Sequence, residues 1–307
     1  MEETLSGYRL FTDLRIGTVQ DLSPSFRRIT FRGPQLSAMA HDGPDQRIKL
    51  VLPHAATGFS TFPVDTDNWY PVWQAVPANA RNPIRTFTIS AVRPHRNELD
   101  VDFAVHGDGG PASAYAIAAQ PGDPIFIVGP DVTLDGPPNA GVGWNPPSGG
   151  TEFVIGADET AVPAALNILK SLAENAEGTA VLEVPSTLDE RAVEAPPGVR
   201  VHWVPRDRME QNSGFGSLQE AIYRIAAHRR AERRMPALVG AETLPAPSAE
   251  EMVWEIPEIT ANSGPYFWLA GEAGCITSLR RQLVGELGID RRSVAFMGYW
   301  REGRALD

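Results

Sequence analysis

The sequence predicts two domains, an antiparallel β-barrel followed by an α/β domain built on a parallel sheet. In the first half of the chain, short segments of alternating hydrophobicity are separated by glycine, proline and asparagine, which is typical of antiparallel barrels. In the second half, short apolar segments alternate with stretches of helical spacing, which indicates parallel strands joined by crossover helices. The length of 307 residues suits two domains that each bury a core.

The first domain is expected to cover residues 1–142. Its strands are predicted at residues 15–20, 26–32, 47–52, 85–90, 99–105 and 124–128. Residues 129–150 are rich in glycine and proline, which disfavours both helix and strand. We interpret this stretch as the connection between the domains.

The second domain is expected to cover residues 143–307. Its strands are predicted at residues 153–156, 180–184, 199–204, 266–270 and 293–299, and its helices at residues 160–174 and 273–287. In the first of these helices, apolar side chains recur three and four residues apart. Ligands of such sheets bind at the carboxyl ends of the strands, where the strand order switches direction.

Residues 85–113 carry the most informative pattern of the chain. Arg85 and Phe87 are two apart on a predicted strand and therefore share a face, where a guanidinium and a flat ring can meet an anionic, planar ligand. The next strand ends in a glycine cluster, and a helix is predicted to begin at Pro111, which offers free N–H groups to a pyrophosphate. A flavin nucleotide fits both halves. An ordinary strand, turn and helix beside an arginine would produce the same local pattern.

A second candidate site follows the strands of the second domain. The turn from Gly156 to Thr160 opens a helix but lacks the G-x-G-x-x-G fingerprint, so Thr160 could serve only as a helix N-cap. Arg206 and Arg208 follow the third strand, where an arginine pair could clamp a 2′-phosphate and favour NADPH over NADH. A solvated loop explains the same two arginines. Glu183 lies within its strand and is poorly placed to bind a ribose.

Composition argues against several classes of function. A net charge of −11 repels nucleic acids and anionic membranes. The single cysteine, Cys275, cannot form an internal disulfide. No apolar stretch reaches the length of about 20 residues that spans a bilayer, and Met1 begins no signal-peptide pattern. A cytoplasmic protein is therefore expected. The six histidines are scattered without metal-ligand spacing, and Ser113 lacks a G-x-S-x-G turn. No resident metal and no hydrolytic activity are expected.

Taken together, the motifs resemble the siderophore-interacting proteins, which are flavin-dependent ferric-siderophore reductases with a ferredoxin reductase-like architecture. The resemblance rests first on residues 84–130, with the strand Arg85-Thr86-Phe87-Thr88 and the turn that runs from His106 to Ser113. It continues through residues 156–164 and 270–274 and ends at residues 298–301. It covers most of the chain, and the blocks occur in the family's order.

This resemblance implies FAD as the bound cofactor, NADPH or NADH as the electron donor, and a ferric siderophore as the substrate, with a ferredoxin as a further potential donor. Nicotinamide gives up two electrons together whereas Fe(III) accepts one, so a flavin must stand between them. Hard oxygen ligands hold Fe(II) less tightly than Fe(III), so reduction releases the iron. No residue is expected to act as a catalytic acid or base.

The resemblance also implies roles for individual residues. Arg85 would pair with a flavin phosphate, Phe87 would pack on the isoalloxazine and Thr88 would reach its polar edge. The full set of flavin contacts is Arg85, Phe87, Thr88, Asp102, His106, Gly107, Gly109, Gly110, Ala112 and Ser113. The nicotinamide-nucleotide contacts are Gly156, Asp158, Glu159, Thr160, Arg206, Arg208, Gly271, Glu272 and Ala273. The siderophore contacts are Lys49 and Arg301. Cys275 lies where related flavin reductases approach the nicotinamide, although a small buried apolar role explains it as well.

The chain departs from the family pattern in three places. Phe87 replaces the usual tyrosine and so lacks its hydroxyl, and Ser90 stands where the family often has arginine. Residues 228–264 are longer than expected and could form a lid, a dimer contact or a disordered insertion. Two other functions stay open: a flavin reductase or electron-transfer protein with a non-siderophore acceptor, and a redox-inactive binding module of the same fold. Flavin colour and acceptor preference would separate these readings.

Overall fold

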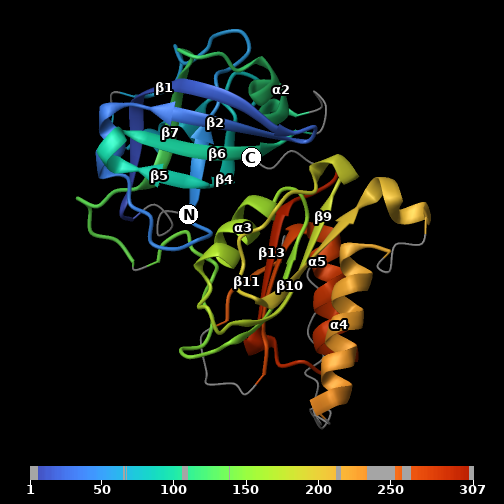
Figure 1. Ribbon diagram of the computed structural model, residues 1–307. Helices are drawn as coiled ribbons and strands as arrows, with labels where there is room; N and C mark the ends of the chain where they lie inside the picture. The colour runs from blue at the N-terminus through green and yellow to red at the C-terminus, as the bar shows by residue number, and fades with distance from the viewer. Residues whose placement is uncertain are drawn as a thin grey trace. The chain divides into compact units, whose positions relative to one another are not determined.

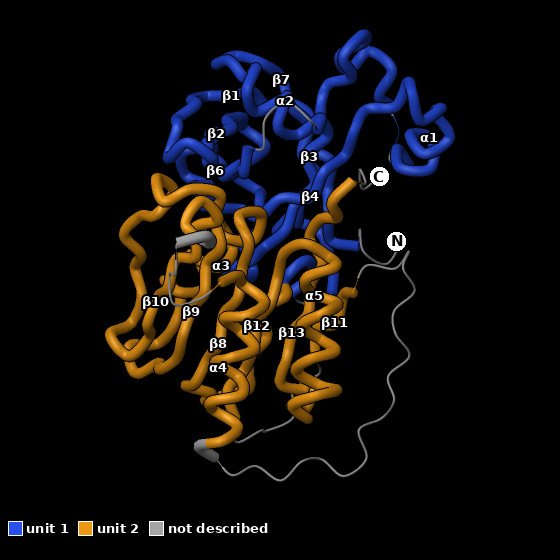
Figure 2. Tube along the Cα trace, turned by 90° about the vertical axis from the view of Figure 1, so that its right-hand side faces the viewer, with its two compact units in different colours: residues 1–142, 306–307 blue, residues 143–305 orange. Residues whose placement is uncertain are grey.

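The computed structural model describes residues 6–64, 66, 68–105, 110–137, 139–211, 216–233, 253–257 and 264–303. The chain divides into two compact units, Met1–Val142 with Leu306–Asp307 and Gly143–Ala305 (Figure 2). Each unit contains its own sheet and its own hydrophobic core. The predicted His106, Gly107 and Gly109 lie outside the described residues, as do residues 234–252 and 258–263 of the long predicted segment.

The sheet of the first unit is antiparallel throughout. Its described strands run in the order β4-β3-β7-β1-β2-β6-β5. They are β1 Tyr8–Ser23, β2 Phe26–Arg32, β3 Arg47–Val51, β4 Ile84–Thr88, β5 Ala91–Arg93, β6 Glu98–Ala104 and β7 Pro124–Pro130. Two helices accompany the sheet, α1 Trp69–Ala75 and α2 Pro111–Ala118. Strands β4 and β5 stand at the two ends of this order, and β4 also approaches β6, on which Phe87 packs through Phe103.

Strand β6 shows how alternation builds the main core of this unit. Leu99, Val101 and Phe103 are fully buried in the core cluster that also contains Phe11, Phe31 and Ile127. The alternate residues of β6 are carboxylates, and they are buried on the other face of the sheet. Both faces of this strand are therefore closed to water, and the polar face needs charged partners.

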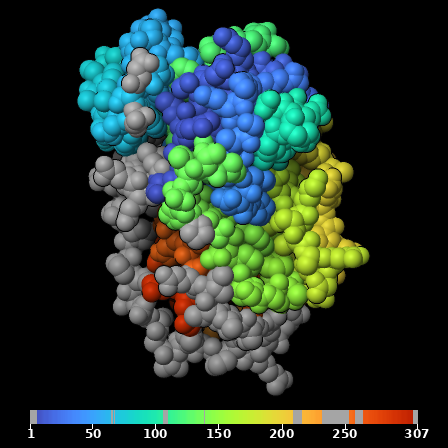
Figure 3. All heavy atoms as spheres, turned by 90° about the vertical axis from the view of Figure 1, so that its left-hand side faces the viewer, coloured from blue at the N-terminus to red at the C-terminus, as the bar shows by residue number. Residues whose placement is uncertain are grey.

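A second, smaller core covers the outer face of β3 and β7. Residues 53–83, which carry α1, bring Phe62, Trp69 and Trp73 against Val51 and Val128. Figure 3 shows this segment in light blue on the surface of the first unit. The segment has no strand alternation and only a short helix, so the sequence alone did not indicate this core.

The second unit contains a mainly parallel sheet in the order β10-β9-β8-β12-β13-β11, counted over its described strands. The strands are β8 Glu152–Ala157, β9 Glu177–Val184, β10 Gly198–Pro205, β11 Trp254–Glu255, β12 Tyr266–Glu272 and β13 Val294–Trp300. All pairs are parallel except β11 with β13. This antiparallel domain followed by a parallel α/β domain confirms the predicted fold class.

Helices cover both faces of the second sheet. They are α3 Val162–Ser171, α4 Leu218–Arg233 and α5 Ala273–Arg280, the last continuing as a π-helical stretch through Arg281–Glu286. Figure 1 shows α3 on one side of the sheet and α4 and α5 on the other. Helix α3 begins later than predicted, because Ala161 is its N-cap and Thr160 lies before it. The strand order reverses between β8 and β12, which places the switch point there.

Candidate functional site

Edge strand β4 places the predicted flavin residues on two faces. Arg85 lies opposite Leu50 and Phe87 opposite Ile48, so both share the face of the main core. Phe87 is half-buried and packs on Phe103, with ring centroids 4.4 Å apart. Arg85 is also half-buried, and its Nη1 donates to the carbonyl oxygen of Ile84 at 2.8 Å. A cation and a partly exposed ring thus lie on the same face of β4.

The start of helix α2 is suited to a pyrophosphate. Gly110 is the N-cap, none of the described side chains caps the helix, Pro111 occupies its first turn, and that turn contains no acidic residue. The first N–H groups of a helix have no partner within the helix and carry partial positive charge. A methyl group at Gly110 would meet no atom of the described, non-adjacent residues within 4 Å. The predicted Ala112 and Ser113 belong to this turn.

Asp102 belongs to a row of ion pairs on the opposite face of β6. Its carboxylate accepts two hydrogen bonds from Arg28, at 2.6 and 2.9 Å. We call this row the acidic ladder: Glu98, Asp100 and Asp102 on β6 with Arg28, Arg32 and Arg93 on the neighbouring strands. The side chain of Asp102 is therefore engaged within the chain, and its structural role is to hold β6 against β2.

Ser90 joins the end of β4 to the same strand. Its N–H donates to the carbonyl of Asp100 at 2.9 Å, and its hydroxyl accepts from the N–H of Asp102 at 3.1 Å. Thr88, which precedes this link, is buried. A serine at this position thus fixes the flavin-side strand to β6, a role that a longer arginine side chain could not fill in the same way.

Lys49 is a partly desolvated cation on the other face of β4 and β3. It lies opposite Thr86, whose hydroxyl accepts from Nζ at 3.3 Å. Burial, together with the neighbouring positive charge of Arg47, lowers the pKa of Lys49. Over the part of the chain that the structure describes, no carboxylate forms an ion pair with Lys49. An anion bound here would relieve both effects, which fits the predicted contact with an anionic siderophore.

In the second unit, Asp158 connects the ends of three strands. It follows β8, and its Oδ1 accepts from the N–H and hydroxyl of Thr160 at 2.9 and 2.6 Å. Its Oδ2 accepts from the N–H of Glu272, at the end of β12, and from Nε1 of Trp300, at the end of β13, both at 2.7 Å. Burial and the charge of Glu159 raise the pKa of Asp158 to about 6, while the bonds from Thr160 and Trp300 oppose the rise.

The glycines of this region are explained by close approach. A methyl group on Gly271, whose φ is +156°, would lie 2.6 Å from Oδ2 of Asp158. Gly156 sits inside β8, where an added methyl would meet Leu269 at 2.8 Å. Close packing against Asp158 thus explains Gly271, and close packing against the core explains Gly156; their predicted contacts with a nucleotide stay predictions.

The residues after β12 begin helix α5. The side chain of Glu272 is its N-cap and accepts from the N–H of Cys275 at 2.9 Å, and Ala273 is fully buried. Burial, with the carboxylates of Glu183, Asp158 and Glu272, raises the pKa of Cys275 to about 12. At neutral pH this thiol is protonated and packs as a small apolar side chain, which is the second of the two roles that the sequence indicates for Cys275.

Arg206 and Arg208 do not form the expected pair of free cations. Arg206 donates to both carboxylate oxygens of Glu159, at 2.6 and 2.7 Å, and to Glu183 at 3.1 Å. Arg208 approaches Glu190 at 3.5 Å. Glu159 is itself only 1 % exposed and forms an ion pair within the chain, and its predicted contact with a nucleotide stays a prediction. Arg301, the second predicted siderophore contact, follows β13 and is half-buried.

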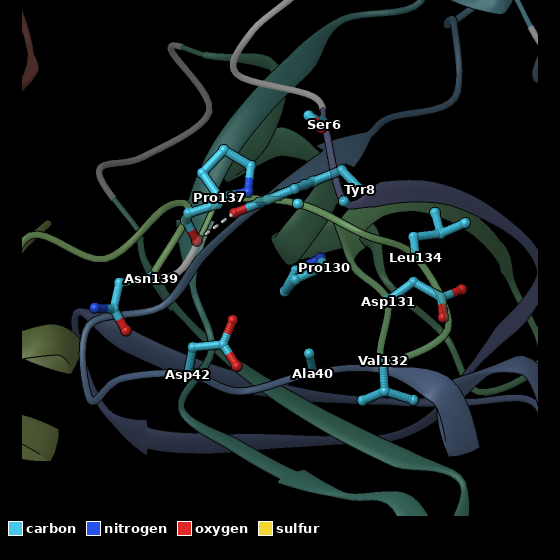
Figure 4. Close-up of a pocket in the computed structure, with 13 residues that line it drawn as sticks. Ser6, Tyr8, Ala40, Asp42, Pro130, Asp131, Val132, Leu134, Pro137 and Asn139 are labelled. Carbon is cyan, nitrogen blue, oxygen red and sulfur yellow. Dashed lines mark hydrogen bonds between the residues drawn. The ribbon is translucent and has the colours of Figure 1, made fainter.

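A pocket of about 370 Å³ lies in the first unit, away from the predicted contacts (Figure 4). It is lined by the start of β1, residues 40–42 and the stretch that follows β7. Tyr8 is held at its rim by hydrogen bonds to the carbonyls of Arg47 and Ala140 at 3.1 Å. The buried carboxylate of Asp131 pairs with Arg9 at 2.9 Å. With Asp42 as a further acid, the pocket does not suit an anionic ligand.

Several residues of these sites were not predicted from the sequence. Trp300 was seen only as part of a motif, and the acidic ladder beyond Asp102 was missed. On β2, polar side chains alternate with core side chains, and they are Arg28, Thr30 and Arg32. The carboxylates of β6 alternate with core side chains in the same way. Such complementary alternation on two strands is a signal by which the sequence could have indicated the ladder.

No described helix is long and apolar enough to cross a membrane, and no described group of acidic, histidine or cysteine side chains is arranged to hold a metal.

An antiparallel unit with an arginine and an aromatic on its edge strand, followed by a parallel α/β unit, defines a ferredoxin reductase-like protein. Ferredoxin–NADP⁺ reductase from Plasmodium falciparum has this fold, with a TM-score of 0.51 at 12% identity over 92% of this chain and 94% of that one. Residues 15–134 match the siderophore-interacting FAD-binding domain, and residues 151–303 match the siderophore-interacting protein model. The chain belongs to the siderophore-interacting protein family, as predicted.

Relatives and solved structures match most of the chain. Ferric vibriobactin reductase ViuB of Vibrio cholerae is 27% identical over 289 residues, which cover 92% of this chain and 86% of that protein. The NADPH-dependent ferric-chelate reductase of Escherichia coli is 28% identical over 68% of this chain and 77% of its own. The siderophore-interacting protein SipS of Aeromonas hydrophila superposes with a TM-score of 0.64 at 28% identity, covering 98% of this chain and 94% of that one.

Proposed function

We propose that this protein is an FAD-dependent reductase that passes electrons from NAD(P)H to a ferric siderophore and so releases Fe(II). One observation carries the proposal: within an FAD-binding domain of the family, the edge strand presents Arg85 and Phe87, and the first turn of helix α2, which follows Gly110, contains no acidic residue. The relatives that reduce ferric vibriobactin and ferric chelates support the choice of acceptor.

The chain's own residues would bind and orient, since electron transfer requires no protein acid or base. Arg85 would pair with a phosphate, the face of Phe87 that Phe103 leaves open would pack on the isoalloxazine, and the first N–H groups of α2 would hold the pyrophosphate. Bound FAD supplies what side chains lack, because it takes up two electrons together and releases them singly. The turns around Asp158 would place the nicotinamide nucleotide at the switch point of the second sheet.

Lys49 would attract the iron complex. The protein carries a net charge of −11, so an anionic siderophore needs a local cation. Lys49 lies on the opposite face of β3 and β4 from Arg85 and Phe87. Lys49 and Phe87 belong to the adjacent strands β3 and β4, so a substrate at Lys49 would lie beside the strand that carries the flavin contacts.

The first test is the colour and turnover of the purified protein. We expect flavin absorbance, and anaerobic reduction of ferric catecholate or hydroxamate siderophores in preference to a simple ferric chelate. A colourless protein would identify a binding module instead. Equal rates with all three acceptors would identify a general flavin reductase.

Variants separate the two halves of the proposal. Arg85→Glu should lose flavin, and retention of flavin as tight as in the parent would contradict the assignment. Lys49→Ala should weaken the ferric siderophore about tenfold, or about 1.4 kcal/mol, with flavin content unchanged. The chain has only one other lysine, Lys170, which is exposed and paired with Glu194 at 3.1 Å. Lys170→Ala therefore controls for net charge and should leave the affinity unaltered.

A further inference from the structure

The carboxyl ends of β8, β9 and β10 hold an arginine that is shared by two carboxylates. We propose that this arrangement makes the nucleotide site selective for NADH over NADPH, with Glu159, Glu183 and Arg206 as the specificity-determining residues. The inference rests on the proposed function, since it takes a nicotinamide nucleotide as the electron donor. It reverses the preference that the arginines indicated in the sequence alone.

Topology places these residues where the adenosine ribose binds in sheets of this type. The strand order reverses between β8 and β12, and β9 is the strand next to β8 on the other side. In such sheets an acidic residue near the end of this second strand accepts hydrogen bonds from the ribose hydroxyls, whereas a nearby arginine accommodates a 2′-phosphate. Glu183 is the next-to-last residue of β9, and Arg206 directly follows β10.

The contacts commit the arginine to the protein. Arg206 makes a two-point contact with Glu159, at 2.6 and 2.7 Å, and a third bond to Glu183 at 3.1 Å. Glu183 is fixed in turn, because its other oxygen accepts from the N–H of Leu218, at the start of α4, at 2.7 Å. The side chain of Glu159 is 1 % exposed and that of Arg206 36 %. Only part of the guanidinium is therefore accessible to a ligand. Its single positive charge is smaller than the two negative charges of Glu159 and Glu183.

A 2′-phosphate would meet unfavourable electrostatics at this position. It carries between one and two negative charges near neutral pH, and it would face two carboxylates that share one guanidinium. To serve the phosphate, Arg206 would have to break its two-bond ion pair with the buried carboxylate of Glu159, which is unfavourable. An unphosphorylated ribose avoids this conflict, because its hydroxyls can donate to the remaining lone pairs of Glu183.

The neighbouring loop increases the negative character of the region. Asp207 accepts from the N–H of Thr187 at 3.0 Å and from the hydroxyl of Ser186 at 2.8 Å. These bonds lower the pKa of Asp207, so it stays ionised. Arg208 is the remaining cation, and it lies 3.5 Å from Glu190 with 54 % of its side chain exposed. This single exposed arginine is the competing explanation for any affinity toward a 2′-phosphate.

The test measures binding rather than turnover. The dissociation constants of NAD⁺ and NADP⁺ are measured by isothermal titration calorimetry on the full chain with flavin bound. NAD⁺ should bind at least about tenfold more tightly than NADP⁺. Adenosine 5′-monophosphate and adenosine 2′,5′-bisphosphate, titrated in the same way, isolate the contribution of the 2′-phosphate. The double variant Glu159→Gln with Glu183→Gln releases Arg206, and it should tighten NADP⁺ by about tenfold while NAD⁺ changes less.

Two further variants keep the test decisive. If the double variant fails to fold, Glu183→Gln alone should tighten NADP⁺ by about threefold, since a glutamine oxygen still accepts from Leu218. Glu190→Gln frees Arg208 by the same chemistry in an exposed pair, and it should leave the ratio of the two affinities within about twofold. Flavin absorbance and the melting temperature report whether each variant is folded.

The possible outcomes are distinguishable. Equal or tighter binding of NADP⁺ by the parent protein, or an unchanged ratio in the Glu183 variant, overturns the selectivity. A shift of the ratio by Glu190→Gln, with none by Glu183→Gln, assigns the site to Arg208 and also overturns it. Binding of neither nucleotide removes both this inference and NAD(P)H as the proposed donor. A clear NAD⁺ preference in a protein that reduces no ferric siderophore retains the inference and overturns only the proposed acceptor.

Discussion

Replacing Asp100 by asparagine tests the acidic ladder that fixes strand β6. The side chain of Asp100 is 6 % exposed. One of its oxygens accepts from Thr30 at 2.8 Å and from Nη2 of Arg93 at 2.7 Å, and the other accepts from Nη1 of Arg93 at 2.8 Å. Asp100→Asn keeps the shape and the first oxygen. It turns the second oxygen into an amide group that cannot accept the N–H of Arg93.

The magnitude follows from the bonds that change. One charge-assisted hydrogen bond is lost, worth about 1.5–3 kcal/mol, and those to the remaining oxygen become bonds to a neutral acceptor, which are about half as strong. Arg93 is 29 % exposed, so water replaces part of the loss. We therefore expect the free energy of unfolding of the first unit to fall by about 2–3 kcal/mol at pH 7.

The pH dependence has a definite sign. Burial raises the pKa of Asp100, but the bonds from Arg93 and Thr30 outweigh it, so the pKa in the folded protein lies below its usual value. A carboxylate of this kind contributes stability above its unfolded pKa of about 3.9, and that stability is lost as the pH falls through the folded pKa. The difference between parent and variant should be constant from pH 7 to about 5 and shrink as the pH falls below about 4.

Urea unfolding followed by flavin fluorescence measures this difference at each pH, because the flavin reports on the first unit. Asp21→Asn is the matched control. Asp21 also bonds an arginine, Arg27, at 2.6 Å in the same unit, but its side chain is 68 % exposed. That variant should change stability by no more than about 0.5 kcal/mol. Equal effects of the two substitutions, or a difference that does not respond to pH, would refute the reasoning.

Three further predictions concern the two sites. Gly110→Asp should cap helix α2 and raise the melting temperature, while flavin content falls because the aspartate charge repels a pyrophosphate. Gly110→Asn is the neutral control. Flavin retained in full by the Asp variant would exclude this site. In Asp158→Asn an amide N–H₂ group would face the N–H groups of Glu272 and Trp300, which are donors as well. Nucleotide affinity and the tryptophan emission spectrum should therefore both change. Parent-like values for both would contradict a positioning role of Asp158. Cys275 should react with thiol reagents at pH 8 only after unfolding, since burial raises its pKa to about 12; rapid labelling of the folded protein would disprove this.

The parts of the fold, and of the placement of the candidate site residues, that were predicted correctly depend on local sequence. The alternation of strands in the first unit, and of strands and helices in the second, follows from hydrophobic periodicity over a few residues. The shared face of Arg85 and Phe87 follows from the two-residue repeat of a strand. The start of α2 at Pro111 was signalled by glycines followed by proline at a permitted position.

What could not be predicted depends on which distant segments meet. Glu159 and Glu183 lie 47 and 23 residues from Arg206 in the chain, and only the register of three parallel strands brings them together. The placement of Lys49 on the face opposite Arg85 likewise depends on the register between β3 and β4. A shift of one residue would reverse that assignment, and which strand pairs with β3 is not indicated by local sequence.

Ion pairing then decides which cations are available to an anionic ligand. The chain has 38 acidic residues against 27 lysines and arginines, so most cations can find a carboxylate within the protein. Arg206, Arg93 and Arg28 have done so, and a ligand gains from them only by breaking an existing pair. Lys49 has no carboxylate partner in the described ranges and its pKa is lowered by burial, so a bound anion stabilises its charged form outright. For this reason the siderophore should depend on Lys49 much more than on any arginine of the ladder.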